Sequence, residues 1–322
     1  MNEFEIIRTF FSHSVVHRDD VPLGIGDDAA VLQPESGRQL VVTADLLVEG
    51  RHFAPDTPPA AVGHKALAVN LSDLAAMGAE PAWFTLSLSL PRAERAWLQD
   101  FVRGMDALAA EYQVQLVGGD TVRGPRVVAV QALGRVAPDR ALRRDGARPG
   151  DRIYVTGTLG DAALALWHQQ GRIRLDEAHR PWLMARLQFP SPRVRAGLAL
   201  VDLASSAIDI SDGLAADLGH VLAASGCGAR IELARLPLSA AFRAQEVPDP
   251  WEAVLAHGDD YELCFTVPPE RQADLEQVLA AMDCGCTCIG EMEAEPGLRL
   301  LQADGTPLIL SRAGHDHFAG GS

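Results

Sequence analysis

The sequence contains a single lysine, Lys65, so nearly all of its positive charge is carried by arginine. Acidic side chains outnumber basic ones, and the formal net charge of the 322 residues is -15 at pH 7. A chain this acidic is not expected to bind nucleic acid or an anionic membrane surface. It can still bind phosphate groups, provided that metal ions or a few well-placed arginines supply positive charge locally.

Cysteine is also scarce, and all five cysteines lie in the last third of the chain. An odd number of cysteines without an export signal is typical of a reducing compartment, so we expect a cytoplasmic protein. The segment Cys284-Gly285-Cys286-Thr287-Cys288 lacks the C-x2-C spacing of structural zinc sites. Its period of two favours one face of a strand, where a free cysteine acts as a small hydrophobe.

Long apolar runs and leader-like segments are missing as well. No uncharged apolar run reaches the ~18 residues of a membrane span. The N-terminal segment MNEFEIIRTF has no basic region followed by an apolar one, so no signal peptide is expected. The P-loop motif, the nucleophile elbow and the metalloprotease helix are not found, which excludes those routes to nucleotide binding or hydrolysis.

The sequence does contain enough apolar residues, 48% of the chain, for a large core, and its length favours two domains. Strand-like and helix-like segments interleave, which predicts an α/β or α+β protein with a mixed N-terminal sheet. Residues 143–151 are polar and rich in Gly, Pro and Arg. They predict a boundary between an N-terminal domain, 1–148, and a C-terminal α/β domain, 149–322.

In the N-terminal part, strands are expected at 39–44 and 83–90, with a long helix at 60–77 between them. Pro91 is expected to start a helix that ends near Tyr112. The elements that follow are, in order, a strand at 114–117, a turn at Gly118-Gly119-Asp120 and a strand at 126–136. In the C-terminal part the predicted elements are a strand at 152–157, a βα turn at 157–161, a helix at 162–170, a helix ending at Leu203, a strand at 207–210, a helix at 213–225, a strand at 261–267, a helix at 268–282, a strand at 286–292 and a hairpin at 298–310.

Aspartates recur at predicted strand ends, beside glycine or other small residues. Asp45 and Asp120 each end a strand, Asp209 and Asp212 flank the end of another, and Asp259-Asp260 precedes a fourth. In open α/β sheets ligands bind at strand ends, and glycine lets the backbone approach a phosphate or an ion.

Three further acids occupy places that suit a bare charge poorly. Asp27 and Asp28 are adjacent in GIGDDAAV, and neighbouring buried carboxylates raise each other's pKa unless a cation lies beside them. Asp73 lies among leucine and alanine in a predicted helix, where a carboxylate is normally paired or bound to a cation. Any one aspartate is more often a cap or turn former. The whole set favours two or more Mg2+ ions and, through them, a nucleotide.

Several long motifs resemble one known family. They are GIGDDAAV, VVTADLLVEGRHF, KALAVNLSDLAAMGAEP, LVGGDTVRGP, GDRIYVTGTLGDAALAL, AIDISDGLAADLGH and HGDDYELCF. They look like the thiamine-monophosphate kinase family, within the superfamily of aminoimidazole-ribonucleotide synthetase, in a collinear match from about Phe4 to Phe318. The resemblance implies ATP-dependent phosphorylation of thiamine monophosphate to thiamine diphosphate, the last step in the biosynthesis of that cofactor. It also implies several Mg2+ ions, a homodimer paired through its N-terminal sheets, and ATP in a cleft at the C-terminal domain.

The resemblance also implies roles for individual residues. The Mg2+ ligands would be Asp28, Asp45, Asp73, Asp120, Asp209 and Asp212, with Asp27, Thr43 and the backbone of Ala44 as further candidates. Nucleotide contacts would be Gly119, Asp120, Arg144 and Ser211. Substrate contacts would be His52, Glu262 and His315, the last at a position where the family generally has an aromatic residue. Lys65 is expected to solvate a helix end rather than to reach a phosphate. No general base is required, because the acceptor is itself a largely ionised phosphate.

Other activities remain as alternatives. Selenophosphate synthetase is disfavoured because no cysteine precedes Cys227. The purine synthetase is disfavoured by the residues of the motifs NLSDLAAMGAEP and HGDDYEL. A non-catalytic nucleotide-binding regulator would keep the acids without needing His52 and Glu262. A Mg2+-dependent phosphatase would release phosphate from thiamine monophosphate without ATP.

Overall fold

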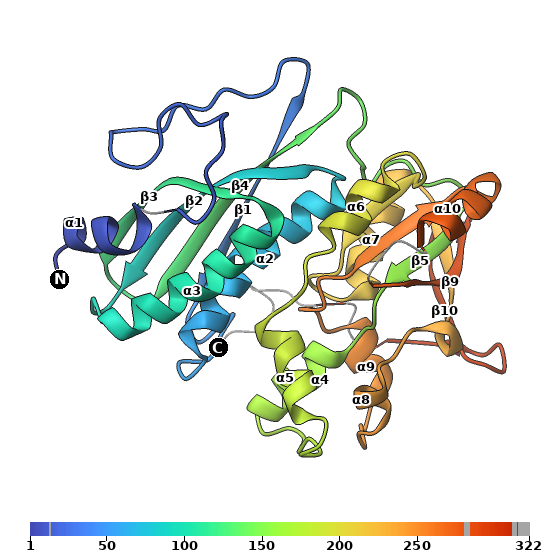
Figure 1. Cartoon of the computed structure of the whole chain (residues 1–322). Coiled ribbons are helices and arrows are strands. Elements are labelled where there is room, and N and C mark those ends of the chain that lie inside the picture. Colours follow the sequence, from blue (N-terminus) through green and yellow to red (C-terminus); the bar gives the residue numbers. More distant parts are fainter. Residues whose placement is uncertain (13, 280–283, 311–313, 315–322) are drawn as a thin grey trace. The chain divides into compact units, whose positions relative to one another are not determined.

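The computed structural model describes residues 1–12, 14–279, 284–310 and 314, and the chain divides into two units (Figure 1). Unit 1 comprises Met1–Leu74 and Ala79–Ala141, and unit 2 comprises Ala75–Gly78 and Leu142–Ser322. Each unit is built on its own β-sheet with helices, so the predicted α/β class is confirmed.

Unit 1 contains a four-stranded mixed sheet in the order β1-β4-β2-β3. Only β2 and β3 run parallel, and the other neighbours are antiparallel. Helices α2 and α3 cover one face of this sheet (Figure 1). The bounds are α1 Glu3–Ile6, a π-helical turn Ile7–Phe11, β1 Gln39–Val48, α2 Pro59–Ala76, β2 Glu80–Leu90, α3 Arg95–Tyr112, β3 Gln115–Arg123 and β4 Val127–Val136.

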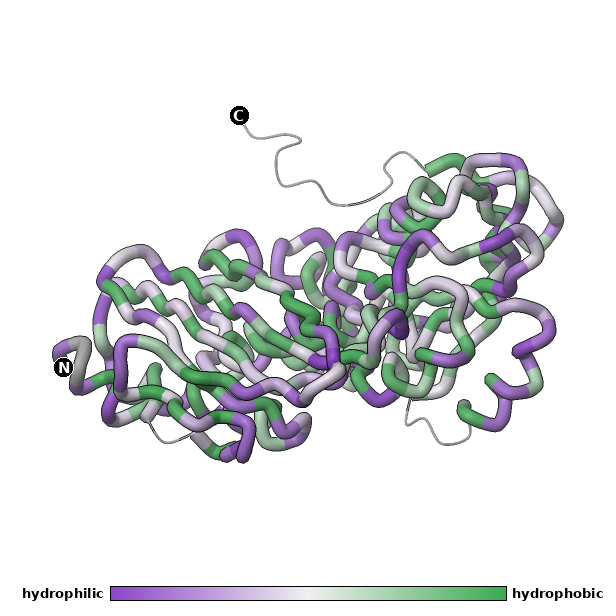
Figure 2. Tube along the Cα trace, turned by 90° about the horizontal axis from the view of Figure 1, so that it is seen from above, coloured by the Kyte–Doolittle hydropathy of each residue, from purple (hydrophilic) through white to green (hydrophobic). Residues whose placement is uncertain are grey.

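The other face of the unit 1 sheet, which we call the open face, carries exposed apolar side chains. Alternate residues of a strand point to opposite faces, so Leu40, Val42 and Leu46 of β1 share one side of the sheet. They are 46%, 53% and 52% exposed, respectively. Thr43, Asp45 and Leu47 of β1 therefore belong to the helix-covered face. Figure 2 shows the alternation of hydrophobic and hydrophilic residues along the chain.

Unit 2 contains a seven-stranded sheet in the order β11-β10-β7-β9-β5-β8-β6. Only β10 and β7 are parallel neighbours. The strands are β5 Arg152–Thr156, β6 Ser206–Asp209, β7 Gly228–Glu232, β8 Leu263–Val267, β9 Cys286–Glu293, β10 Gly297–Leu301 and β11 Pro307–Leu308. The helices are α4 Asp161–Gln169, α5 Arg180–Gln188, α6 Val194–Leu200, α7 Leu214–Ser225, α8 Ala240–Arg243, α9 Pro250–Leu255 and α10 Gln272–Leu279.

Several local predictions for the N-terminal part are wrong. The segment Gly118-Gly119-Asp120 is not a turn but the middle of β3, where it pairs with Thr85–Ser87 of β2. Asp45 likewise lies inside β1, which continues to Val48, so neither acid marks a strand end. The helix expected from Pro91 begins only at Arg95. Lys65 lies within α2 and is 5% exposed, so it does not solvate a helix end.

In unit 2, the segment with three cysteines behaves as its period of two predicts. Cys286 and Cys288 lie in β9, and all five cysteines are free thiols. Burial raises the pKa of Cys286 to about 12, and the neighbouring Cys284 and Cys288 add to the shift. Such a thiol stays protonated at neutral pH and is a weak nucleophile. In the ranges described, no helix is long and apolar enough to cross a membrane.

Candidate functional site

A pair of carboxylates joins β1 to α2 on the helix-covered face of unit 1. Thr43 donates a short hydrogen bond from Oγ1 to Oδ2 of Asp73. Burial, together with the charge of Asp73 and a hydrogen bond with it, raises the pKa of Asp45 to about 7. Two such carboxylates cannot both ionise easily without a positive charge nearby. The oxygen donors and their mutual repulsion therefore fit a bound divalent cation.

Asp120 lies in a different part of the same sheet. By its register with Ser87 and Ala129 it belongs to the open face, on the edge strand opposite β1. Three strand spacings of about 4.8 Å put it roughly 14 Å from β1 along the sheet. One cation therefore cannot be held by Asp45 and Asp120 of the same chain. The resemblance grouped these acids, but the sheet separates them into two positions.

Gly119 is required by the close approach of β2 to β3. Its φ is +154°, and a Cβ atom built on it would lie 1.8 Å from the carbonyl oxygen of Leu86. The neighbouring Asp120 accepts a hydrogen bond from the backbone N–H of Thr121 at 2.8 Å. A side chain at Gly119 would push β3 away from β2 and displace Asp120 with it.

Asp27 and Asp28 are exposed residues of a loop, so water solvates both charges. The backbone N–H of Asp28 donates to Oδ1 of Asp27 at 2.8 Å, and Leu23 and Val31 form a bridge across the loop. The argument that burial forces a cation between these two acids therefore fails. Their role as metal ligands now rests on the resemblance alone.

His52 lies in the turn after β1, and its ring is held by the backbone. Its Nδ1 accepts the N–H of Val48 at 3.0 Å. In the neutral ring the proton is then on Nε2, which makes Nε2 a hydrogen-bond donor. A phosphate oxygen accepts from such a donor, and the expected contact of His52 with substrate stays a prediction.

In unit 2, Asp209 is the last residue of β6 and is 4% exposed. Ser211 and Asp212 follow in the short loop to α7 and are half-buried. Arg144 is exposed, and its backbone carbonyl oxygen accepts a hydrogen bond from Ser225 Oγ at the end of α7. The strand-end position predicted for Asp209 and Asp212 is confirmed.

Asp217 of α7 binds the backbone of the loop that follows β6. One oxygen of this buried carboxylate, Oδ2, accepts the backbone N–H groups of Ser211, Asp212 and Gly213 at 3.0, 3.0 and 3.1 Å. Burial raises the pKa of Asp217 to about 7, although the bonds from these backbone N–H groups favour its charged form. Asp217 was not among the residues that the sequence predicts for the site.

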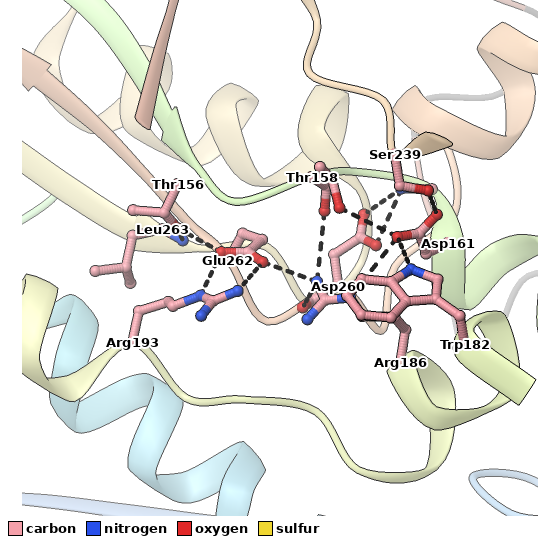
Figure 3. Close-up of polar contacts among 11 residues, drawn as sticks. Thr156, Thr158, Asp161, Trp182, Arg186, Arg193, Ser239, Asp260, Glu262 and Leu263 are labelled. Carbon is pink, nitrogen blue, oxygen red and sulfur yellow. Dashed lines mark hydrogen bonds and ion pairs between the residues drawn. The ribbon is translucent and has the colours of Figure 1, made fainter. Parts of the chain in front are cut away.

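Glu262 is the centre of a buried ion network (Figure 3). Its carboxylate accepts hydrogen bonds from Arg193 Nε at 2.6 Å, Arg186 Nη2 at 2.8 Å and Thr156 Oγ1 at 2.6 Å. Burial raises the pKa of Glu262, but the hydrogen bond and charge of Arg193, with Arg186 and Thr156, outweigh it and leave the pKa below its usual value. The carboxylate is thus enclosed by three protein partners.

Next to Glu262, the turn from β5 to α4 is held by two more buried acids (Figure 3). Asp260 accepts the N–H of Gly160 at 3.0 Å, and burial raises its pKa well above the usual value. Asp161 accepts hydrogen bonds from Ser239 Oγ at 2.6 Å and Trp182 Nε1 at 3.2 Å. Both acids are hydrogen-bonded to groups of the chain itself and stabilise the turn, which supports the prediction of an ordinary βα turn.

Asp259 is the carboxylate of this loop that is only half-buried. Asp259 and Tyr261 have φ of 68° and 50°, a left-handed conformation that a bulky aromatic residue rarely adopts. Strain of this kind is concentrated at functional sites. Tyr261 donates its hydroxyl to Asp259 Oδ1 at 3.2 Å. The sequence predicts Asp259 as a strand-end acid but not as a residue of the site.

Within the ranges that the structure describes, no three His, Cys, Asp or Glu side chains gather into a ready-made metal site. Mg2+ usually takes only one or two carboxylates and completes its shell with water and substrate phosphates. A pair of carboxylates such as Asp45 and Asp73 is therefore enough for a Mg2+ site. His315 lies outside the described residues, and its expected contact with substrate stays a prediction.

Comparison with known proteins defines the class first. Residues 26–136 match the N-terminal domain, and residues 148–302 the C-terminal domain, of the AIR synthase related proteins. Two bacterial thiamine-monophosphate kinases align over nearly the whole chain. The Escherichia coli K12 protein is 49% identical over 98% of both chains, and the Haemophilus influenzae protein is 40% identical over 99% of this chain and 98% of its own. The chain belongs to the thiamine-monophosphate kinase family.

Solved structures agree with this assignment. A thiamine-monophosphate kinase from Stenotrophomonas maltophilia K279a superimposes with a TM-score of 0.85 and 47% identity, covering 91% of this chain and 93% of that one. AaThiL complexed with AMPPCP and TMP gives a TM-score of 0.77 at 33% identity, covering 91% and 92% of the two chains. Hydrogenase maturation protein HypE, at 21% identity and a TM-score of 0.74, shares the fold.

Proposed function

We propose that the protein transfers the γ-phosphoryl group of ATP to thiamine monophosphate, giving ADP and thiamine diphosphate, in the cytoplasm. The observation that carries this proposal is the collinear relationship to thiamine-monophosphate kinases over 98% of the chain. The complex of AaThiL with AMPPCP and TMP supports the same pair of ligands, an ATP analogue and the monophosphate acceptor.

Mg2+ fits the acids of both units. In unit 1, Asp45 and Asp73 would hold it, with Thr43 fixing the orientation of Asp73. In unit 2, Asp209 and Asp212 would hold it at the end of β6. When bound, Mg2+ neutralises phosphate oxygens and lets two polyanions approach each other in line. Asp120 is a further candidate, and Asp27, Asp28 and the carbonyl oxygen of Ala44 are candidates by the resemblance alone.

The protein's own groups would position the reactants. The acceptor phosphate is largely ionised at neutral pH, so the reaction needs no general base. His52 would donate Nε2–H to that phosphate, because its Nδ1 is already occupied by Val48. In unit 2, Arg144 and Ser211 would contact the nucleotide. Gly119 is a nucleotide contact by the resemblance alone, because in the structure it is required by the close approach of β2 to β3.

The positively charged thiazolium of the substrate needs a negative partner, and the structure favours Asp259 over Glu262 for this role. Glu262 is fully buried and is bonded to Arg193, Arg186 and Thr156. Asp259, three residues earlier, is half-buried in a strained loop. We therefore assign Glu262 to holding this loop in place and Asp259 to the substrate cation.

A homodimer paired through the open faces of two unit 1 sheets would cover the exposed Leu40, Val42 and Leu46. We expect Val42→Asp to give a monomer, because the dimer would bury the new charge unpaired. Leu198→Asp is the matched control, since Leu198 is 40% exposed on α6 in unit 2. Sedimentation velocity measures both variants, and a dimeric Val42→Asp protein would contradict the pairing.

The activity itself is tested by incubating the protein with ATP, thiamine monophosphate and Mg2+ and measuring thiamine diphosphate by chromatography. EDTA should abolish the product, and Asp73→Asn should reduce its rate about 100-fold or more, the upper range for disturbed metal-site ligands. Asp100→Asn, on the exposed side of α3, should leave the rate unchanged. Phosphate release from thiamine monophosphate without ATP would instead support a phosphatase.

A further inference from the structure

The loop between β6 and α7 contains three backbone N–H groups that converge on one point. The groups belong to Ser211, Asp212 and Gly213, and they lie at the N-terminal end of the twelve-residue helix α7. Converging N–H groups at a helix N-terminus are a common binding place for phosphate, because the groups and the helix dipole both favour negative charge.

In this protein a carboxylate of the chain itself occupies that point. Asp217 is 3% exposed, and its Oδ2 atom accepts all three N–H groups at 3.0 to 3.1 Å. An external phosphate cannot use donors that are already bonded. In place of these N–H groups the loop offers the side chains of Ser211 and Asp212, which are half-buried.

A second loop fixes the same backbone from the other side. The N–H of Asp259 donates to the carbonyl oxygen of Ser211 at 3.0 Å, and the N–H of Tyr261 donates to Ile210 at 2.9 Å. At Gly258, a Cβ atom would lie 1.7 Å from the carbonyl oxygen of Ser211, so only glycine permits this contact. The backbone around Asp212 is held on both sides, which fixes where its carboxylate can point.

We propose that Asp217 is a positioning residue for the cation-binding loop of unit 2. Its carboxylate accepts the backbone N–H groups of residues 211–213, so these groups cannot bind a phosphate. The loop would then bind the phosphates of a nucleotide through a divalent cation on Asp209 and Asp212. The identity of the nucleotide rests on the proposed function, but the effect of Asp217 on cation binding does not.

The test uses Mn2+ as the probe and electron paramagnetic resonance to measure its affinity for the full-length protein. All variants are made in an Asp73→Asn background, which removes the main carboxylate pair of unit 1 from the titration. Asp217→Ala should weaken Mn2+ binding about 10-fold, and Asp217→Asn, whose amide oxygen accepts fewer and weaker bonds, about threefold. Asp249→Ala is the matched control, because Asp249 caps the N–H of Glu252 in α9 and its loss should leave Mn2+ affinity unchanged.

Hydrogen exchange of a peptide covering residues 209–217 provides a second readout, and it should be faster in Asp217→Ala. Equal Mn2+ affinity in Asp217→Ala and Asp249→Ala would overturn the proposal. If Asp217→Ala does not fold, Asp217→Asn decides, and an unchanged affinity again overturns it. Should the wild-type protein make no thiamine diphosphate while Mn2+ affinity still depends on Asp217, the proposed function fails and the positioning role stands.

Discussion

The buried carboxylate of Glu262 provides a sharp prediction about stability. Replacing it by glutamine keeps the shape but removes the negative charge that faces Arg186 and Arg193, whose side chains are 11% and 17% exposed. Removing one partner of a buried ion pair typically costs about 3–5 kcal/mol. For a unit of this size, each kcal/mol lowers the melting temperature by about 2–4 °C, so Glu262→Gln should melt about 6–20 °C lower.

Thermal unfolding followed by circular dichroism measures this difference at pH 7.5. The folded pKa of Glu262 lies below its unfolded value of 4.5, so its stabilisation is fully present above about pH 4.5 and is lost as the pH falls through the lower folded value. The gap between wild type and variant should therefore close in acid.

Asp259→Asn is the matched control for Glu262→Gln, because it lies in the same loop and asparagine tolerates the left-handed conformation. It should change the melting temperature little but reduce turnover of thiamine monophosphate. If Glu262→Gln melted at the same temperature as Asp259→Asn, the assignment of Glu262 to holding the loop would be refuted.

Two further predictions concern unit 1. Gly119→Ala should destabilise the protein by about 2 kcal/mol or more, because its Cβ would overlap Leu86; Gly118→Ala, where the nearest contact is 4.0 Å away, should differ from wild type by less than about 1 kcal/mol. The midpoints of urea unfolding compare the two variants, and an equal loss of stability in both would contradict the close approach of β2 to Gly119. Burial raises the folded pKa of Asp106 to about 6, above its unfolded 3.8, so Asp106→Asn should stabilise the protein at pH 8 by about 1 kcal/mol after allowance for solvent screening. That gain should vanish below about pH 4, and a gain independent of pH would show another cause.

Hydrophobic periodicity was sufficient to predict the central elements of unit 1. The helix expected at 60–77 is α2, Pro59–Ala76, and the strand expected at 39–44 is the first part of β1. Both segments have strong patterns, and the acid that breaks the pattern of α2, Asp73, is in contact with Thr43. Local sequence therefore reveals a misplaced charge when the surrounding residues are uniformly apolar.

Glycine-rich segments were harder to interpret, because glycine is compatible with both turns and close strand contacts. Gly118-Gly119-Asp120 has the composition of a turn, yet it continues β3 because β2 approaches it closely. Only the partner strand decides between the two structures, and that strand is not adjacent in the sequence.

The surroundings of Glu262 could not be predicted for a similar reason. Its partners Arg186 and Arg193 are 76 and 69 residues away in the sequence, and no local pattern connects them. The motif assigned Glu262 to the substrate, whereas tertiary contacts enclose it and leave Asp259 only half-buried. Asp217 was missed because an aspartate in the first turns of a helix usually has only a local role.

The central claim is phosphoryl transfer from ATP to a phosphate acceptor, and phosphorus NMR tests it most directly. The protein is mixed with ATP, thiamine monophosphate and Mg2+, and the spectra are followed over time beside an EDTA control. The account predicts thiamine diphosphate signals that grow in step with ADP and disappear with EDTA. Intact ATP, or orthophosphate without any diphosphate product, would contradict it.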